Sequence, residues 1–323
     1  MNISKKYKLT DETIVISGNI TLHRIKALRD FGDVKKGDLG GFVESNENLS
    51  QDDNCWIYDD AKVFGCAYVF INAKVYGNAQ VNGDAHVFDN ACVGDEALVF
   101  GDAQVFGNAK ICWNALVYGN ARVYGNAAVY EHAIVYDNAW VFDKADVHGN
   151  ARVYENAMIY QYAQIFDNSH VYGHAHVGDN AHVLDKADVH GNARVYGNAV
   201  IYQDAMVYEN AHVYENARVC QNAKIHGNAC VCGISHVYGY ANIFGDAEIS
   251  DMQDYLVFKN WWSSGRYFTW TRSDDMWTCG CFHGTGKELI KKAYQDSELS
   301  GREYERIVNY VESIKSEINK IKQ

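Results

Sequence analysis

The sequence predicts an all-β solenoid, a parallel β-helix, over most of its 323 residues. A Val or Ile recurs at every sixth residue from Ile57 to Ile249, and a small residue, nearly always Ala, stands two places before each. Such a short fixed period indicates a stack of similar units that bury one continuous core. Proline is absent from the chain, which suits a fold whose strands all donate backbone hydrogen bonds to neighbours.

The repeat unit at residues 119–124, Gly-Asn-Ala-Arg-Val-Tyr, indicates how each side of a coil is built. Ala121 and Val123 lie two residues apart, so they face the same side of an extended segment, whereas Arg122 and Tyr124 face the other. Gly and Asn tolerate positive φ and form the corner between sides. Three six-residue sides make a coil of about 18 residues, and the tract predicts about eleven coils. The pattern resembles the hexapeptide-repeat proteins, and that resemblance implies a left-handed parallel β-helix.

Three domains are expected from the changes in pattern: an N-terminal β cap at 1–50, the β-helix at 51–250, and a small α+β unit at 251–323. A solenoid needs such caps because its terminal strands expose unpaired backbone groups. Strands at 13–16 and 21–25 alternate around Ser17-Gly18-Asn19, which predicts a hairpin. Residues 38–43 then lead into the first, irregular coil.

The C-terminal segment changes composition abruptly after Ile249. Strands are predicted at 255–258 and 267–271, with a third within 276–282. Thr285 with Glu288, and Ser300 with Glu303, form two capping boxes that each predict the start of a helix.

Composition narrows the classes of partner and compartment. A formal net charge of −12 argues against non-specific nucleic-acid binding. No apolar run follows residues 1–6 and no segment is long enough to span a bilayer, so we expect neither a signal peptide nor a membrane partner. Nine cysteines stand at unlike positions of the repeat, which indicates reduced thiols and a cytoplasmic protein.

Several segments carry a further family resemblance. Residues 21–25, 40–43, 49–50 and 55–58, followed by the repeats, resemble the start of bacterial YdcK-like proteins, which are often labelled transferases or polymer-forming proteins. The repeat tract and residues 262–269 also resemble proteins that recur in phages and prophages of Firmicutes, which would place the protein in the cytoplasm of a bacterial host. The resemblance implies the fold and carries over no catalytic residue.

An enzymatic role is a secondary expectation. Hexapeptide-repeat acyltransferases generally interrupt the prism with a loop that helps to build the active site, and these repeats contain no insertion. His170 with Asp188, 18 residues on, is a weak catalytic candidate, because a carboxylate beside an imidazole orients a general base. The alternative is a charged ladder on a solvated strand.

A metal site is a second weak candidate. His212, Cys230, Cys232 and Glu248 are zinc-ligand types that fall on neighbouring outward positions. Two ligands two residues apart on a strand lie about 7 Å apart, too far for one zinc ion without rearrangement. We therefore expect no metal and no cofactor.

The outward residues of several consecutive coils are unusually apolar. An exposed patch of this kind generally marks an interface, and solenoids of this type commonly associate side by side. We therefore expect a homotrimer whose interface contains three aliphatic and three aromatic residues: Leu98, Leu116, Ile134, Phe100, Tyr118 and Tyr136.

The C-terminal unit gathers aromatic residues and arginines that suit a small anionic or nucleotide ligand. The candidate ligand-binding residues are Trp261, Trp262, Arg266, Tyr267, Trp270 and Arg272, and the alternative is that the aromatics form the core of a cap. The first functional hypothesis is a non-catalytic, homo-oligomeric binding or scaffold protein. The alternatives are a protein that sequesters a nucleotide-type ligand and a hexapeptide-class acyltransferase.

Overall fold

The computed structural model describes residues 5–321, together with the side chains of all of these except 316 and 318–321. The chain forms two compact units, unit 1 (Met1–Asn180) and unit 2 (Ala181–Gln323). The predicted fold class is confirmed, because a parallel β-solenoid with an 18-residue register is accompanied by a small C-terminal region of sheet and helices. The predicted domain boundaries at 50 and 250 stay a prediction.

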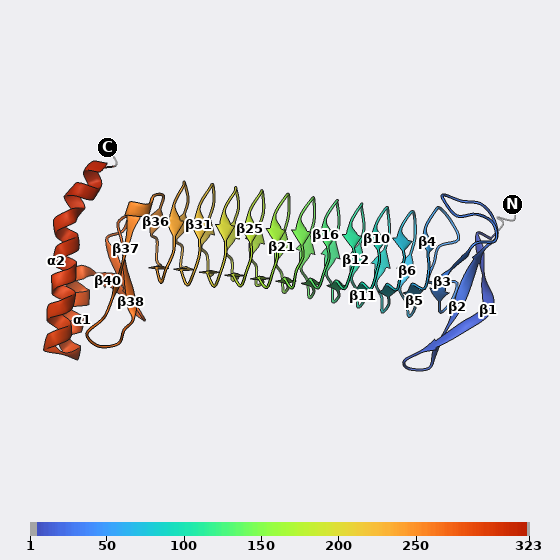
Figure 1. Cartoon of the computed structure of the whole chain (residues 1–323), viewed down its shortest axis with the longest axis horizontal. Helices are drawn as coiled ribbons and strands as arrows, with labels where there is room; N and C mark the ends of the chain where they lie inside the picture. Colours follow the sequence, from blue (N-terminus) through green and yellow to red (C-terminus); the bar gives the residue numbers. More distant parts are fainter. Residues whose placement is uncertain (1–4, 322–323) are drawn as a thin grey trace. The chain divides into compact units, whose positions relative to one another are not determined.

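Unit 1 begins with an antiparallel hairpin of β1 (Tyr7–Ile16) and β2 (Ile20–Ala27), drawn in blue in Figure 1. Gly18 and Asn19 adopt positive φ at its turn, as the sequence predicts, and the strands are longer than expected. Strand β3 (Leu39–Val43) pairs with β2 in antiparallel fashion and with the first repeat strand of its sheet in parallel fashion. Strand β3 therefore joins the hairpin to the solenoid, and the hairpin covers the exposed backbone edge of the first coil.

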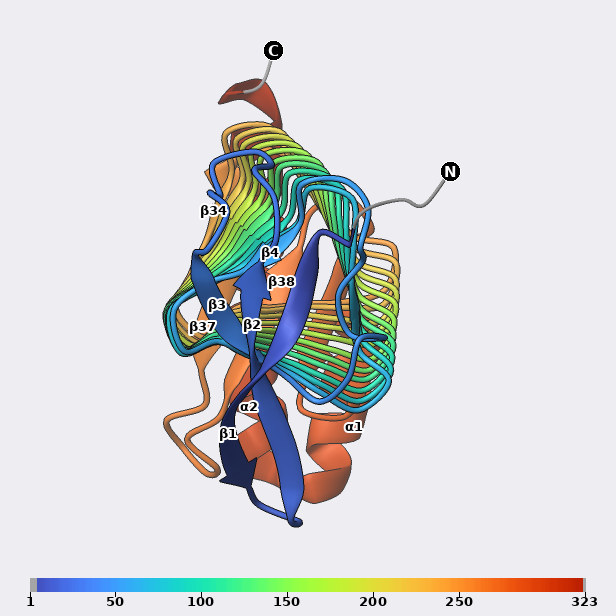
Figure 2. The same ribbon diagram turned by 90° about the vertical axis from the view of Figure 1, so that its right-hand side faces the viewer.

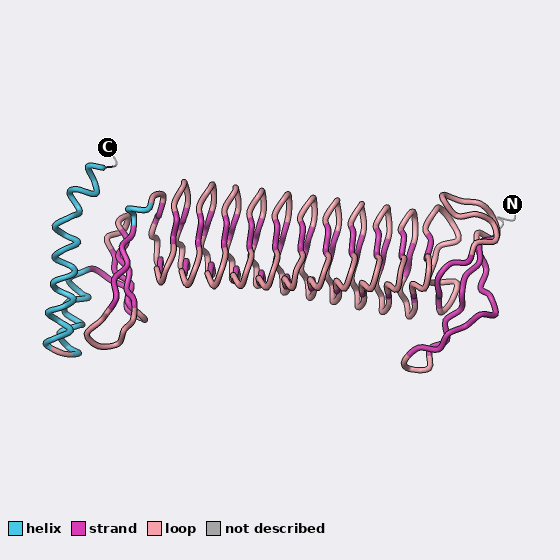
Figure 3. The backbone as a smooth tube through the Cα atoms, in the orientation of Figure 1, coloured by secondary structure: helices cyan, strands magenta, loops and turns pink. Residues whose placement is uncertain are grey.

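The repeats of unit 1 form two-residue strands separated by corners, seen as short magenta segments in Figure 3. These strands are β4 (Trp56–Ile57), β5 (Lys62–Val63), β6 (Tyr68–Val69), β7 (Lys74–Val75), β8 (Gln80–Val81), β9 (His86–Val87), β10 (Cys92–Val93), β11 (Leu98–Val99), β12 (Gln104–Val105), β13 (Lys110–Ile111), β14 (Leu116–Val117), β15 (Arg122–Val123), β16 (Ala128–Val129), β17 (Ile134–Val135), β18 (Trp140–Val141), β19 (Asp146–Val147), β20 (Arg152–Val153), β21 (Met158–Ile159), β22 (Gln164–Ile165), β23 (His170–Val171) and β24 (His176–Val177).

Every third strand belongs to the same sheet, so unit 1 has three faces. In face 1, β3 is followed by β5-β8-β11-β14-β17-β20-β23. Face 2 runs from β4 to β22 and face 3 from β6 to β24, each through every third strand. Figure 2 looks along the coils, where the blue and green turns of unit 1 lie one behind another. Residues 18 apart are therefore direct neighbours on a face, as Leu98 and Leu116 are on face 1.

The interior of the coils contains the repeated Ala and the repeated Val or Ile. Ala121 and Val123 are completely buried, as are their equivalents throughout the tract. Backbone hydrogen bonds join successive coils, for example from the Arg122 amide to the Ala139 carbonyl at 2.9 Å. Burying one Val side chain contributes about 1.5–3 kcal/mol to the free energy of folding, so each added side of a coil stabilises the core further.

The corners require left-handed backbone, and their side chains form a second set of bonds between coils. Gly107 has a φ of 69°, and Asp89 occupies the corresponding corner one coil earlier with a φ of 57°. The Gly107 amide donates to Asp89 Oδ2 at 3.1 Å. The next residue at many corners is Asn, whose amide donates to the Asn one coil on, as Asn72 does to Asn90 at 3.2 Å. The Asp-Asn and Gly-Asn pairs therefore supply both the corner geometry and a ladder along the solenoid.

The repeats of unit 2 form the same kind of two-residue strands. They are β25 (His182–Val183), β26 (Asp188–Val189), β27 (Arg194–Val195), β28 (Val200–Ile201), β29 (Met206–Val207), β30 (His212–Val213), β31 (Arg218–Val219), β32 (Lys224–Ile225), β33 (Cys230–Val231), β34 (His236–Val237), β35 (Asn242–Ile243) and β36 (Glu248–Ile249). Their pairing orders are β26-β29-β32-β35, β25-β28-β31-β34 and β27-β30-β33-β36.

A four-stranded antiparallel sheet and two helices follow the last coil of unit 2. After the 3-10 turn η1 (Met252–Asp254) come β37 (Tyr255–Lys259), β38 (Tyr267–Thr271), β39 (Met276–Cys279), β40 (Phe282–Thr285), α1 (Gly286–Asp296) and α2 (Glu298–Ile321). Side chains of this region bond to the backbone of the last coil, since the Asn242 amide donates to Thr269 Oγ1 at 2.9 Å. Neither helix in the described part of the chain is long and apolar enough to cross a membrane.

Two sequence predictions for this region need correction. The single strand expected within 276–282 is a hairpin, because Gly280 takes a φ of 59° between β39 and β40. The second helix begins at Glu298, not at Ser300, and the Ser300 amide donates to Ser297 Oγ at 3.1 Å. The Thr285–Glu288 capping box is confirmed at the start of α1.

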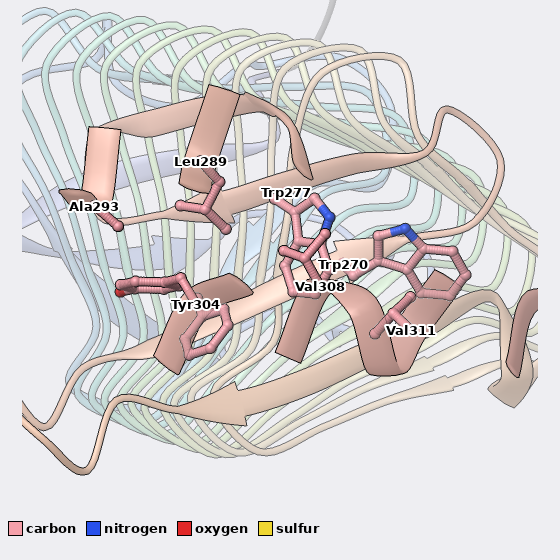
Figure 4. Packing of buried hydrophobic residues seen from close by; sticks show 8 residues of the cluster. Trp270, Trp277, Leu289, Ala293, Tyr304, Val308 and Val311 are labelled. Atoms are coloured by element: carbon pink, nitrogen blue, oxygen red, sulfur yellow. The ribbon is translucent and has the colours of Figure 1, made fainter. Parts of the chain in front are cut away.

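The aromatic residues between the sheet and the helices form a compact core (Figure 4). Trp270 and Trp277 are 1% exposed, and Val308 and Val311 of α2 pack against them. Tyr304, also on α2, packs with the same cluster. This core holds the two helices on the sheet.

Asp89→Ala is expected to lower the free energy of unfolding by about 1–2 kcal/mol, because it removes the acceptor of the Gly107 amide and leaves Ala in left-handed backbone. Asp89→Asn is the matched control, since its side-chain oxygen keeps the acceptor and Asn tolerates this φ. Urea unfolding followed by circular dichroism measures both. Equal loss in the two variants would contradict the role given to the corner side chain.

Candidate functional site

A groove with chemically mixed lining lies on face 3 of unit 1. Its floor consists of four residues in consecutive register along the sheet, namely Arg122 on β15, Trp140 on β18, Met158 on β21 and His176 on β24. All four occupy the first strand position of the repeat, where the side chain points away from the buried Val. The groove has a volume of about 500 Å³ and also includes His174.

One wall of the groove is an asparagine ladder. The Asn120 amide donates to Asn138 Oδ1 at 3.2 Å, and the Asn138 amide donates to Asn156 Oδ1 at 3.3 Å. The ladder ends there because His174 stands at the next asparagine position. The Asn156 amide nitrogen consequently has no acceptor among the residues that the structure describes, and it lies in the lining of the groove.

Three of the floor residues contact aromatic rings on the same face. The Arg122 guanidinium lies 5.2 Å from the Trp140 ring centroid, a cation–π arrangement. Trp140 also meets the ring of Tyr124 edge-on, with centroids 6.4 Å apart. His176 meets Tyr160 in the same manner at 6.4 Å. The groove therefore places an indole, a guanidinium, a thioether and an imidazole side by side on a rigid sheet.

Sequence reasoning did not identify this groove. One feature of the sequence could have indicated the groove. The outward position before the buried Val or Ile is Trp in only two repeats, at Trp56 and Trp140. A second such feature is His174, which replaces Asn in a series of asparagines spaced 18 residues apart. Neither change alters the six-residue period on which the sequence prediction depended.

The weak catalytic candidate His170 lies on face 1 of unit 1. It pairs in register with Arg152 and meets the Tyr154 ring edge-on at 6.4 Å. Asp188 lies on β26 of unit 2. The pairing of these two side chains as a catalytic dyad stays a prediction.

The predicted interface residues come together on face 1 of unit 1. Leu98, Leu116 and Ile134 are consecutive neighbours in register, and each is partly exposed. Beside them the rings of Phe100 and Tyr118 stack with centroids 4.8 Å apart, and the ring of Tyr136 continues the stack at 5.0 Å. The six residues form one continuous patch, and its use as an interface stays a prediction.

The six predicted ligand-binding residues of unit 2 do not form one pocket. Trp270 is buried in the core, and its indole nitrogen donates to Asp275 at 2.8 Å. Trp262 packs edge-on against Tyr304, and Trp261 is 71% exposed. Tyr267 stacks on Tyr240 with centroids 4.2 Å apart.

The two arginines of that group have different surroundings. Arg272 forms an ion pair with Asp254 at 2.6 Å, and the Asp254 side chain is only 3% exposed. Asp254 Oδ2 also accepts from the Ser250 and Asp251 amides, each at 2.9 Å. Arg272 therefore neutralises a buried carboxylate that shapes the chain after the last coil. Arg266 instead lines a cavity of unit 2.

The metal candidates His212, Cys230 and Glu248 are neighbours in register, as the sequence predicts. Cys230 pairs with His212 on one side and with Glu248 on the other. Cys232 is buried, and burial raises the pKa of Cys230, which keeps that thiol protonated. Within the described residues, no group of three or more His, Cys, Asp or Glu side chains could hold a metal ion.

A cysteine–histidine contact in unit 2 was not predicted. Cys220 Sγ lies 3.2 Å from His236 Nε2, and the same nitrogen lies 3.3 Å from the Tyr202 hydroxyl. Cys220 is 3% exposed, and its burial raises the thiol pKa. A buried, protonated thiol is a poor nucleophile, so the contact stabilises the side chains of this face.

Comparison with known proteins supports the solenoid. Residues 115–131 match the family described as "YdcK Beta solenoid repeat". The chain is also similar to the protein named "Uncharacterized acetyltransferase YdcK" of Escherichia coli (strain K12), with 38% identity over 73 residues. That match spans 20% of this chain and 22% of the relative. The predicted resemblance to YdcK-like solenoid proteins is confirmed.

Arg272→Ala is expected to destabilise unit 2 by about 3 kcal/mol, because it leaves the buried Asp254 carboxylate without its cation. Arg266→Ala, which removes an exposed arginine of the same region, should leave stability within about 0.5 kcal/mol. Chemical unfolding followed by tryptophan fluorescence reports on both, since Trp270 and Trp277 lie in the affected core. A stable Arg272→Ala protein would show that this ion pair has no structural role.

Proposed function

We propose, on the premise that the chain is a YdcK-like solenoid protein, that it binds a nucleotide-bearing acyl donor of the coenzyme A class and transfers the acyl group. The Trp140 groove carries this proposal, because it sets aromatic, cationic, apolar and acid–base groups in consecutive register on face 3. Its volume of about 500 Å³ lies within the range of small-molecule sites. The name of the relative, an acetyltransferase, supports the same class of reaction.

Each floor residue suits one part of such a donor. The indole of Trp140 offers a plane on which an adenine base can stack. Arg122, beside it, offers a guanidinium to a phosphate group. Met158 is an adaptable apolar contact for the pantetheine arm or the acyl chain, and His176 lies one coil further on.

The transfer step requires a base and an oxyanion donor at the far end of the groove. His176 accepts the proton of the acceptor's amine or hydroxyl as that nucleophile attacks the acyl carbon. The carbon–sulfur bond of the thioester then breaks, and the thiolate leaves and takes up a proton. The Asn156 amide nitrogen, at the end of the asparagine ladder, donates to the carbonyl oxygen as negative charge develops.

A second candidate function is binding of the same ligand without turnover. The uninterrupted repeats favour it. No loop is inserted between the strands that form the groove, β15 to β24, so no loop there covers a reacting group and excludes water from it. Both candidates place the nucleotide at Trp140, so one set of variants tests the binding step of each. Turnover then separates them.

Trp140→Ala is expected to weaken acetyl-CoA binding at least about tenfold, because the base loses its stacking plane. Trp113→Ala is the matched control, since Trp113 is 51% exposed at a corner and does not line the groove. Isothermal titration calorimetry measures both affinities. Equal affinities in the two variants would place the ligand elsewhere.

His176→Gln extends the same experiment to catalysis. For a transferase, the variant should keep acetyl-CoA affinity and lose turnover about a hundredfold or more. For a binding protein, neither the parent nor the variant releases free thiol from acetyl-CoA when amine acceptors are supplied. Failure of the parent to bind acetyl-CoA at all would reject both candidate functions.

The apolar patch of face 1 supports a further part of the proposal, a homotrimer with Leu98, Leu116 and Ile134 in the interface. Three partly exposed aliphatic residues beside a stack of aromatic rings are costly to leave in water. Side-by-side contact of the patches would cover them.

Leu98→Asp combined with Leu116→Asp is expected to reduce the subunit number, because two carboxylates would be buried in the interface. Lys110→Asp, on face 2, is the control for added negative charge. Size-exclusion chromatography with light scattering gives the subunit number of each protein. An unchanged number in the double variant would exclude this patch as the interface.

A further inference from the structure

Unit 2 contains a cavity that the proposed acyl-donor groove does not include. It has a volume of about 300 Å³ and lies among the 260–266 loop, the β39–β40 hairpin and the two helices. Its lining includes two cations, three serines and two thiols. These residues are Arg266, Lys292, Ser263, Ser264, Ser300, Cys279 and Cys281.

The loop that contributes Arg266 is held in place by a buried asparagine. Asn260 is 3% exposed, and its Oδ1 accepts from the Ser263 amide at 2.9 Å and from Ser263 Oγ at 3.0 Å. The Asn260 amide donates to the Arg266 carbonyl at 2.8 Å, which closes the loop. Ser264 Oγ accepts from the Arg266 amide at 3.3 Å. The loop backbone and the hydroxyls of Ser263 and Ser264 are therefore positioned before any ligand arrives, which lowers the entropic cost of binding.

The two cations of the cavity have no carboxylate partner among the residues whose side chains are described. In the described part of the chain, neither Arg266 nor Lys292 forms an ion pair. Arg266 lies over the hairpin turn, since a Cβ on Gly280 would stand 3.4 Å from Arg266 Nη1. Lys292 Nζ lies 5.4 Å from the Phe282 ring centroid. Asp296 is the only acidic residue of the lining, so the cationic groups exceed the acidic ones.

The lining of the cavity also supplies a neutral hydroxyl, that of Tyr304. Tyr304 is 7% exposed, and its hydroxyl lies 3.1 Å from Cys279 Sγ and accepts from the Asn260 side-chain amide at 3.3 Å. Burial, with the neighbouring Cys279 thiol, raises the pKa of Tyr304, so the phenol adds no negative charge to the cavity. Ser300 lies in the first turn of α2, where the helix dipole also favours an anion.

We propose that this cavity binds a small phosphate monoester, with Arg266 and Lys292 on the phosphate oxygens and the serine hydroxyls completing the contacts. The charge of a phosphate dianion is matched by these two cations. The Arg guanidinium can donate two parallel hydrogen bonds to two oxygens of one phosphate group. The volume suits a phosphorylated sugar-sized molecule and is at the lower limit for small-ligand sites. The site does not depend on the acyltransferase proposal, because its residues all lie in unit 2.

The test uses the full-length protein and isothermal titration calorimetry with three probes: inorganic phosphate, ribose 5-phosphate and succinate. Ribose 5-phosphate is expected to bind with a Kd below about 1 mM, inorganic phosphate more weakly, and succinate more weakly still. Arg266→Ala and Lys292→Ala should each weaken ribose 5-phosphate binding about tenfold or more. Both side chains are exposed, so the variants should fold.

Two matched variants make the result specific. Lys291→Ala removes a neighbouring exposed lysine of α1 that does not line the cavity, and it should bind like the parent. Trp140→Ala should also bind the phosphate ester normally, which separates this site from the acyl-donor groove. No saturation by ribose 5-phosphate up to about 10 mM, or equal binding by the Arg266→Ala/Lys292→Ala double variant, would overturn the proposal. Stronger binding of succinate would do so as well, since it would assign a dicarboxylate to the cavity.

Discussion

The close packing of Ala and Val inside a narrow coil is the constraint on which the rest of this structure depends. Ala121 leaves room for the backbone to approach, and Val123 fills the space, so the coil closes around a small residue, which is Ser at positions 169 and 235. Because the spacing of one small and one branched residue recurs at every side, residues 18 apart are aligned along a face. Every surface column, whether asparagine, aromatic or aliphatic, follows from that alignment.

The same constraint explains where chemistry can reside. The strand positions that point outward are free to vary, because they contribute little to the core. A change at one of them places a new side chain next to known neighbours one coil away on either side. The groove over Trp140 results from four such changes in adjacent coils, whereas the cavity of unit 2 needed a separate sheet, two helices and a loop closed by Asn260.

The sequence predicts the solenoid well because its period is local and repeated. The Val positions, the corners and the N-terminal hairpin all appear where the pattern indicates them. The functional sites were less predictable, because they depend on contacts that have no period. Trp270 and Arg272 suit a ligand by composition, yet the fold uses one as core and the other to neutralise Asp254. Trp140 has an ordinary place in the repeat, and its importance comes from the residues above and below it.

The six-residue side also determines what insertions such a chain can accept. Adding one side of Gly-Asn-Ala-x-Val-x form leaves every buried position filled, while it moves each later outward residue to the next face. Adding a single residue would instead turn the buried Val of every later strand toward water. A lineage of such proteins can therefore reassort its surface columns by gaining or losing whole sides, without any change in the composition of its interior.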